Sequence, residues 1–301
     1  MNIAIIGDTH LAKTVGSRTD NYAETCLNKL EQVLSQNDYV FCLGDFFNTA
    51  VVDTDLVGSV YTLLKNYRNT ELITIIGNHC CFNMNENSLY RTSLGLLELT
   101  GVIKVLRPND YFEVGEGLCF KALPLNFKDI KPDNDSCFFL GHHYYGLNCA
   151  DSLSEDMIKE YFPNSLGLAL GHEHQPFPTV ECNGVNIYRP GSLLRNAATD
   201  YNKKRKPFYY QITLDEWKQG LPFRPIQLDC AEGKDIFVDN IVIKRREKFL
   251  ENVDRVIKLC SEKVNSDTKY SMVEALKEIK TPARSFDYIV KTCKTLGIPL
   301  K

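Results

Sequence analysis

Apolar runs of strand length recur along the first two thirds of the chain, and each ends in glycine followed by a polar residue. The runs are rich in Ile, Val, Leu and Phe and do not alternate with polar residues, which is typical of strands buried on both faces. The five runs are NIAIIGDTH (2–10), YVFCLGD (39–45), LITIIGNH (72–79), CFFLGHH (137–143) and LGLALGHEH (166–174). The pattern predicts five strands that carry polar side chains at their carboxyl ends.

Segments with apolar residues at helical spacing lie between these runs, at residues 22–36, 55–67 and 88–99. Alternating strands and helices predict a layered α/β domain. In such sheets, sites form where loops leave the carboxyl ends of the strands, so we expect the five glycine turns to meet at one edge. A further strand is predicted at 208–214, and it ends the domain that we place at residues 1–214.

The composition is that of a globular protein, because 301 residues with 44% hydrophobic content can bury a sizeable core. No apolar stretch reaches the length of a membrane span, and the N-terminus carries no basic leader. Eleven cysteines without CxxC spacing indicate a reducing compartment rather than a disulfide framework. We therefore expect a cytoplasmic protein with no membrane partner, in which residues such as Cys42, Cys119 and Cys137 are small core side chains.

The net charge of −3 conceals two halves of opposite sign. Residues 1–200 contain 14 basic and 24 acidic residues, a balance of −10, whereas residues 201–301 contain 21 and 14, a balance of +7. The basic residues gather at KKRK (203–206) and KRREK (244–248). These clusters are either a solvated surface or a binding face for an anionic partner such as a nucleic acid backbone.

All six histidines of the chain fall in the five strand-end motifs, together with two aspartates and an asparagine. This mixture of carboxylate, amide and imidazole donors, without ligand-like cysteine spacing, favours a catalytic metal centre over a structural zinc site. The donors are too many for one tetrahedral ion and enough for two, which predicts two divalent metal ions, with Mn favoured over Zn, Fe or Mg. A bridging carboxylate would leave such a site positive, so that it could bind a phosphate ester and activate water. The predicted chemistry is hydrolysis of a phosphorus ester.

The order Asp-x-His, Gly-Asp, Gly-Asn-His, His and Gly-His-x-His, over about residues 1–210, resembles the calcineurin-like metallophosphoesterases. The resemblance implies an α/β fold, a four-layer αββα sandwich, with a small C-terminal appendage at 215–301. It implies one ion bound by Asp8, His10, Asp45 and His174. It implies a second ion bound by Asp45, Asn78, His142 and His172. His79 would be the catalytic proton donor, and Glu173 would point away in a structural role.

The chain differs from this family pattern at two positions. The family usually has an acidic residue after Gly-Asn-His, where this chain has Cys80. An acidic side chain there could orient the catalytic histidine, so we expect His79 to be loosely oriented, with an effect on the rate or the substrate preference. His143 adjoins His142. Because His142 directly follows a strand-end glycine, as in the other motifs, we expect His142 rather than His143 to be the ligand.

Three segments are similar to the nuclease subunits of SbcCD-type double-strand-break repair complexes and to phage recombination exonuclease subunits: GDFFNTA (44–50), CFFLGHHYYGLN (137–148) and YRPGSLLRN (188–196). The resemblance implies a DNA nuclease, an SMC-like coiled-coil ATPase as partner, and a homodimer formed through the helices after the second and third motifs. A Pro-Gly turn that leads to the next strand would also explain the third segment.

The C-terminal third contains no histidine beyond residue 174 and no GxxxxGK[ST] loop, so an ATP-driven step would come from another protein. Its predicted elements are strands in PFRPIQL (222–228) and DIFVDNIVIK (235–244) and helices at 248–262, 269–279 and 285–296. The region would cap DNA and bind the partner, or only cover the core. Three functions stay open: a DNA phosphodiesterase, which we favour, a small-molecule phosphodiesterase or phosphatase, and a scaffold with a degenerate metal site, which the complete ligand set disfavours.

Overall fold

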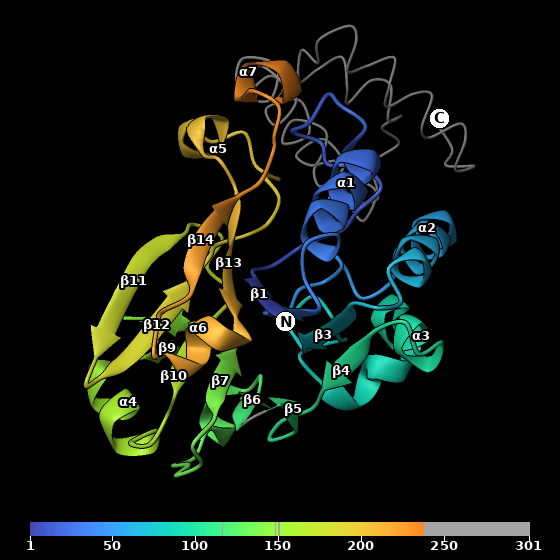
Figure 1. Ribbon diagram of the computed structural model, residues 1–301. Coiled ribbons are helices and arrows are strands. Elements are labelled where there is room, and N and C mark those ends of the chain that lie inside the picture. Colours follow the sequence, from blue (N-terminus) through green and yellow to red (C-terminus); the bar gives the residue numbers. More distant parts are fainter. Residues whose placement is uncertain (116, 148, 150, 238–301) are drawn as a thin grey trace, which may run out of the picture. The chain divides into compact units, whose positions relative to one another are not determined.

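The computed structural model describes residues 1–115, 117–147, 149 and 151–237 (Figure 1). Met1–Phe237 form one compact unit. The KRREK cluster and the helices predicted at 248–262, 269–279 and 285–296 lie outside the described residues. In the part of the chain that is described, no helix is long and apolar enough to span a bilayer.

Two six-stranded sheets form the centre of the unit. The first sheet has the order β14-β13-β1-β2-β3-β4, in which β1 to β4 run parallel. Its strands are β1 (Asn2–Ile6), β2 (Tyr39–Cys42), β3 (Glu71–Ile75), β4 (Lys104–Leu106), β13 (Phe208–Thr213) and β14 (Arg224–Gln227). The strands predicted at 208–214 and 222–228 are thus confirmed as β13 and β14, which pair antiparallel.

The second sheet has the order β11-β12-β10-β7-β6-β5, with β6, β7, β10 and β12 parallel. Its strands are β5 (Tyr111–Gly115), β6 (Leu118–Ala122), β7 (Phe138–Gly141), β10 (Gly167–Leu170), β11 (Phe177–Cys182) and β12 (Val185–Arg189). A separate small sheet pairs β8 (Tyr144–Tyr145) with β9 (Ser152–Leu153). All five glycine-terminated runs are strands, so this part of the sequence prediction is confirmed.

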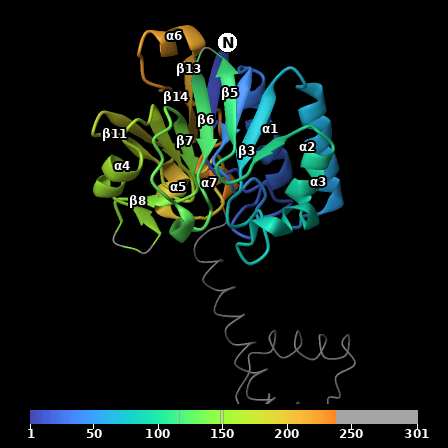
Figure 2. The ribbon, with the colours of Figure 1, turned by 90° about the horizontal axis from the view of Figure 1, so that it is seen from below.

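Helices cover the outer face of each sheet, which makes four layers (Figure 2). The first sheet is covered by α1 (Tyr22–Leu34), α2 (Thr54–Asn66) and α3 (Ser93–Leu99), and the second by α4 (Glu155–Tyr161). The short helices are η1 (Glu86–Arg91), η2 (Phe127–Asp129), α5 (Asp200–Lys204), α6 (Leu214–Lys218) and α7 (Gly233–Ile236). The expected α/β sandwich is confirmed.

The core between the sheets explains why the strand sequences do not alternate. Ile3 and Ile5 of β1 face the second sheet, while Ala4 and Ile6 pack against the helices. Across the inter-sheet core, Phe41 of β2 stacks on Phe120 of β6 with ring centroids 3.9 Å apart. Each central strand therefore buries both faces, as its apolar run predicts.

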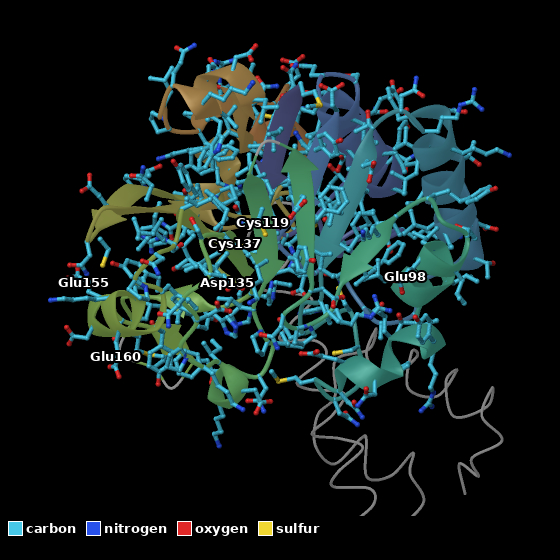
Figure 3. The ribbon with its side chains drawn as sticks, turned by 60° about the horizontal axis from the view of Figure 1, so that its bottom comes forward. Glu98, Cys119, Asp135, Cys137, Glu155 and Glu160 are labelled. Carbon is cyan, nitrogen blue, oxygen red and sulfur yellow. The ribbon has the colours of Figure 1, made fainter. Side chains whose placement is uncertain are left out.

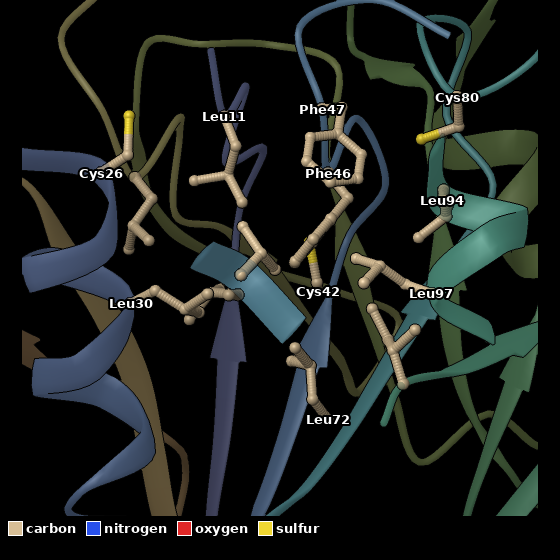
Figure 4. Packing of buried hydrophobic residues seen from close by; sticks show 14 of the residues in the cluster. Leu11, Cys26, Leu30, Cys42, Phe46, Phe47, Leu72, Cys80, Leu94 and Leu97 are labelled. Carbon is tan, nitrogen blue, oxygen red and sulfur yellow. The ribbon is translucent and has the colours of Figure 1, made fainter. Parts of the chain in front are cut away.

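All the described cysteines are free thiols, and most of them belong to these cores, whereas Cys149 is exposed and Cys230 is partly exposed. Cys119 on β6 and Cys137, which directly precedes β7, lie next to each other (Figure 3), and of the two only Cys119 is partly accessible. Cys42 and Cys80 lie in the core between the first sheet and its helices, where Cys80 sits near Leu94 and Phe46 (Figure 4). The expectation that cysteines act here as small apolar side chains is confirmed.

Two predicted elements differ from the structure. The helix expected at 88–99 is broken at Thr92, whose backbone is extended and whose hydroxyl accepts a hydrogen bond from the N–H of Gly95. A Cβ at Gly95 would lie only 2.1 Å from the carbonyl oxygen of Leu89, so glycine allows this tight packing of η1 on α3. Of the strand expected at 235–244, Asp235 and Ile236 lie instead in helix α7, and residues 238–244 lie outside the described residues. Apolar periodicity does not report such a side-chain cap, which is why the single helix was wrong.

Replacement of Phe120 by alanine should lower the free energy of unfolding by about 3–5 kcal/mol, because it removes a fully buried ring from the centre of the inter-sheet core. Denaturant unfolding of the full chain measures this. Tyr111→Ala on the neighbouring strand β5 is the control, since Tyr111 is 63% exposed and should change little. Equal effects of the two substitutions would contradict the packing described.

Candidate metal centre

The structure brings the polar residues after five strands to one edge of the two sheets. Asp8 and His10 follow β1, Asp45 follows β2, Asn78 and His79 follow β3, His142 follows β7, and His172 and His174 follow β10. Three overlapping groups have potential ligand atoms within 4.8 Å of one another: Asp8–His10–His174, His10–Asp45–His79 and Asp8–Asp45–His142. Asp8 and Asp45 each belong to two of these groups.

Asp45 lies in the middle of the cluster. Its Oδ2 is 3.3 Å from His142 Nε2, 3.8 Å from His10 Nε2 and 4.0 Å from His79 Nε2. Its Oδ1 accepts a hydrogen bond of 2.7 Å from the backbone N–H of His79. Burial opposes ionisation of Asp45, but His142 and His10 outweigh burial and hold the pKa of its carboxyl below the usual range. This central, ionised carboxylate suits a bridging ligand.

On one side of Asp45, His10 and His174 face each other. Their Nε2 atoms are 2.8 Å apart, and His174 Nε2 is 3.6 Å from Asp8 Oδ2. Burial lowers the pKa of His10 to about 3, so its ring is neutral at physiological pH. Two imidazole nitrogens this close, beside a carboxylate, match the donor set of a divalent cation.

On the other side of Asp45, His142 meets Asn78 and His172. His142 Nε2 lies 2.9 Å from Asn78 Oδ1 and 3.2 Å from His172 Nδ1. Its Nδ1 donates to the carbonyl oxygen of Leu43 at 2.7 Å, which directs Nε2 into the site. Burial opposes protonation of His142, but the Asp45 and Asp8 carboxylates outweigh it and raise the pKa of His142 to about 9. A cation that binds at Nε2 must therefore displace a proton.

The backbone is strained at three of the candidate ligands. His10 (φ 44°), Asp45 (φ 43°) and His172 (φ 79°) adopt the left-handed region, which costs a residue with a side chain roughly 1–3 kcal/mol. Hydrogen bonds hold these conformations: the N–H of His10 donates to the Asp45 carbonyl at 2.8 Å, and the N–H of His172 donates to both carboxylate oxygens of Asp8 at 3.1 Å. The turns thus aim the side chains into the site.

Glycine is required beside both carboxylates. A Cβ at Gly77 would lie 2.3 Å from Asp45 Oδ1, and a Cβ at Gly171 would lie 2.6 Å from Asp8 Oδ1. A real Cβ does not approach an oxygen so closely, so alanine at either place would push the carboxylate out of the cluster. This close approach explains two of the glycines in the repeated strand-end pattern.

His79 is oriented by the main chain. Its Nδ1 donates to the carbonyl oxygen of Asn48 at 2.6 Å, and its side chain stays 41% exposed. The neighbouring Cys80 is 1% exposed and points into the apolar core (Figure 4), so the position after His79 cannot present a polar group to the ring. The expected loose orientation of His79 beside Cys80 was wrong, because the Asn48 carbonyl holds the ring; the expected effect on rate or substrate preference stays a prediction.

His143 and Glu173 have their side-chain partners outside the group of candidate ligands. His143 Nε2 donates to the carbonyl oxygen of Pro124 at 2.7 Å, and burial lowers the pKa of His143 to about 4. Glu173 Oε2 is 3.9 Å from a guanidinium nitrogen of Arg189, and that guanidinium lies over the ring of Phe177. The structure thus brings His142, and not His143, to the other donors.

The cluster opens into a cavity of about 390 Å³ lined by Asp45, Asn78, His79, Tyr144, His172, Glu173, His174 and Gln175. The ring of Tyr144 lies 4.4 Å from that of His172, and the sequence offers no signal for this contact. A larger cavity of about 510 Å³ beside β11 and β13 is lined by residues such as Phe177, Phe208 and Lys206. It has no set of metal donors among the described residues that line it, so the smaller cavity is the candidate site.

The KKRK segment is not one surface cluster. Arg205 is only 6% exposed, and its guanidinium donates to the carbonyl oxygens of Ser192 (2.7 Å) and Leu194 (2.8 Å). Lys204 and Lys206 are exposed and Lys203 is partly exposed. The interpretation of all four residues as one binding face was therefore wrong for Arg205, whose charge is used inside the fold.

Asp45→Asn should lose far more bound metal than Glu173→Gln, because only Asp45 lies where it can contact two ions. Elemental analysis of the purified, Mn-loaded variants measures this. Equal metal content in the two variants would rule out a shared ligand at Asp45.

Metal binding near pH 7.5 should release about one proton, because His142 is protonated below its pKa of about 9 and must lose that proton to bind. Affinity for Mn should accordingly rise with pH toward 9, about tenfold per pH unit for one displaced proton. Titration calorimetry in buffers of different ionisation enthalpy counts the protons. A proton count near zero would contradict this protonation state.

Comparison with known proteins gives a family. The profile of the family described as calcineurin-like phosphoesterase matches residues 1–176, whereas no curated protein sequence matches the chain. Among solved structures, TT1561 of Thermus thermophilus is 11% identical, with 75% of this chain and 98% of that chain covered and a TM-score of 0.49. A Staphylococcus aureus protein assigned as a 5'-nucleotidase, in complex with alpha-ketoglutarate, is 14% identical, with 82% of this chain and 58% of that chain covered and a TM-score of 0.44. Neither similarity is high enough to indicate a substrate. The family profile covers more than half of the sequence, and the chain belongs to the calcineurin-like phosphoesterases.

Proposed function

We propose that the chain is a Mn-dependent phosphodiesterase that cuts DNA. One observation carries the chemistry: donor atoms from five strand ends converge around Asp45 beneath an open cavity. Membership of the calcineurin-like phosphoesterases implies a metal-dependent hydrolase, and the Asp, Asn and His donors suit two divalent ions. DNA as substrate and Mn as metal are the specific parts of the proposal.

The proposed ligands divide into two sets that share Asp45. The first set is Asp8, His10, Asp45 and His174. Its closest pair of potential ligand atoms is His10 Nε2 and His174 Nε2, which are 2.8 Å apart. The second set is Asp45, Asn78, His142 and His172. Two ions bound there would supply a water nucleophile and positive charge for the phosphoryl oxygens. The two sets of ligands would hold the ions, and the cavity beside them would admit the ester.

His79 is the proposed proton donor to the leaving alkoxide. Since its Nδ1 is engaged by the Asn48 carbonyl, Nε2 is the atom that is left to exchange a proton with substrate. Nε2 is 4.0 Å from Asp45 Oδ2 and the side chain is partly exposed at the cavity, where a leaving group would depart. The same nitrogen is also near enough to the cluster to be a ligand, so its role needs a direct test.

Replacing His79 by alanine should leave the metal content unchanged and reduce cleavage of DNA by roughly 10²–10⁴-fold, which is typical for loss of a general acid. The reduction should be smaller for bis-p-nitrophenyl phosphate, because p-nitrophenolate leaves with little need of a proton. His143→Ala is a control for loss of an imidazole outside the cluster. If His79→Ala loses one metal equivalent, or slows the cleavage of DNA and of bis-p-nitrophenyl phosphate equally, His79 is not the proton donor.

DNA is supported by the similarity of residues 44–50, 137–148 and 188–196 to segments of repair nucleases, and by the accessible lysines at 203, 204 and 206. One observation favours the alternative, a small-molecule phosphodiesterase or phosphatase. Arg189, Arg195 and Arg205 are at most 8% exposed, so these residues do not form an exposed basic surface along which a nucleic acid backbone could lie. A substrate panel separates the two functions.

The panel consists of single-stranded DNA, duplex DNA, bis-p-nitrophenyl phosphate and p-nitrophenyl phosphate, each with the full chain and Mn. Cleavage of DNA with weak monoesterase activity would support the nuclease. Efficient hydrolysis of the small esters with intact DNA would favour the alternative. If the protein binds two metal ions but hydrolyses none of these substrates, both enzymatic functions are contradicted. The remaining function would then be that of a non-catalytic scaffold.

Replacing Lys203, Lys204 and Lys206 by glutamine should make DNA affinity less dependent on salt. The slope of log affinity against log salt concentration should decrease by about 0.7–0.9 for each phosphate that is no longer neutralised. Arg205 is kept because it is buried and bonded to the main chain. Hydrolysis of bis-p-nitrophenyl phosphate should not change. Lys65→Gln, on the exposed end of α2, is a control for loss of charge elsewhere. If the salt dependence of DNA affinity is unchanged in the triple variant, these lysines do not contact DNA and are only a solvated surface.

Assembly is part of the same proposal. Tyr90, Leu96 and Leu99 are 51–68% exposed on η1 and α3, the elements after the third motif, and would contribute to a homodimer. The coiled-coil ATPase partner is proposed to bind the region beyond residue 237, which lies outside the described residues. A reducing, cytoplasmic location is consistent with the free thiols of the described cysteines.

A further inference from the structure

A second cavity, distinct from the candidate metal centre, is surrounded by buried positive charge. It measures about 360 Å³ and lies between α1 and the segment that precedes α7. Its basic lining residues are Arg18, Lys29 and Arg195, and its acidic ones are Asp20 and Asp229. None of its lining residues is shared with the cavity of the metal centre.

The cations around this cavity are withdrawn from solvent. Lys29 is 3% exposed, Arg195 is 2% exposed, and the nearby Arg205 is 6% exposed. Only Arg18 has a carboxylate partner, because its guanidinium donates twice to Asp20 at 2.6–2.7 Å. Among the described residues, no ion pair is found for the other three. Several buried charges without counter-ions are strongly unfavourable, because the protein interior does not replace the hydration that each charge loses.

Hydrogen bonding leaves donors free at the same place. Lys29 Nζ donates to the carbonyl oxygen of Asp229 at 3.0 Å, which uses one of its three protons. The Arg195 guanidinium donates to the carbonyl oxygens of Arg205 and Ala231, but its Nε is buried without a partner. Lys29 and Arg195 line the same cavity, and each has at least one N–H without a partner, so together they offer a donor pair for an anion.

The electrostatics agree with this geometry. Burial lowers the pKa of Lys29 to about 8; Cys230 acts in the opposite direction, and the guanidinium groups of Arg195 and Arg18 lower the pKa of Lys29 further. The Asp20 carboxylate is already engaged by Arg18 and by the hydroxyl of Thr25, and Asp229 is exposed to solvent. An added anion would relieve the repulsion that these groups exert on Lys29.

We propose that this cavity is an oxyanion site of the phosphate class, with Lys29 Nζ and Arg195 Nε as its free donors. A tetrahedral oxyanion can accept from both donors and neutralise the excess charge of Lys29, Arg195 and Arg205. The anion is either a free phosphate or a phosphate group of a polynucleotide, which present the same chemistry. The proposal does not depend on hydrolysis at the metal centre.

Titration calorimetry of the metal-free full chain with inorganic phosphate, at constant ionic strength, tests the site. Phosphate should bind, and Lys29→Gln should weaken binding by about tenfold or more, as expected for loss of a charged hydrogen bond. Asp45→Asn should bind phosphate as the wild type does, because it alters only the metal centre. Lys121→Gln is the matched control, since Lys121 is a shielded lysine that already has Asp133 and Asp135 as partners.

Two further arms complete the test. Arg195→Lys keeps the positive charge but removes the guanidinium Nε, so it should also weaken phosphate binding. This variant provides the test if Lys29→Gln does not fold. A short DNA duplex that displaces phosphate in a Lys29-dependent way would identify a polynucleotide as the source, and lack of displacement would identify free phosphate. Absence of phosphate binding by the wild type, or binding lost in Asp45→Asn but kept in Lys29→Gln, would overturn the proposal.

Discussion

The buried carboxylate of Asp45 is the group on which the rest of the site depends. It is 1% exposed and yet ionised, a state that is stable only beside positive or hydrogen-bonding partners. The main-chain N–H of His79 and the ring of His142 supply such partners. Asp8, whose pKa is raised by burial, adds a second acidic group nearby. A protein that buries two carboxylates at one sheet edge needs cationic charge there, from imidazolium or from metal ions.

The sandwich architecture is what assembles this charge. The first sheet supplies the carboxylates and Asn78 through β1, β2 and β3, while the second sheet supplies His142, His172 and His174 through β7 and β10. Neither sheet alone contains the complete donor set. The inter-sheet core, with Phe41 stacked on Phe120, therefore also fixes the distance between the two halves of the site. Left-handed backbone at the strand ends is tolerated because the packed sheets and the hydrogen bonds of the turns determine it.

Positive charge is distributed differently from what a count of basic residues suggests. Arg189 lies against Glu173 behind the metal centre, and Arg205 ties the loop at Ser192 to the chain after α5. Lys29 and Arg195 line a separate buried cavity. Guanidinium groups suit such positions, because their fixed fork of donors can satisfy several carbonyl oxygens at once. A basic sequence segment is thus not by itself a surface for an anionic partner.

The sequence by itself determined the five buried strands, the α/β class and the meeting of their polar ends, since these follow from apolar runs closed by glycine and from the geometry of parallel sheets. It also singled out His142 over His143, from the place of each relative to Gly141. Only the tertiary structure decided what no residue type reports: that the Asn48 carbonyl orients His79, that Tyr144 lies on His172, and that Arg205 is buried. These contacts join residues distant in the chain, or use backbone atoms that every residue has, so they arise only when the two sheets pack together.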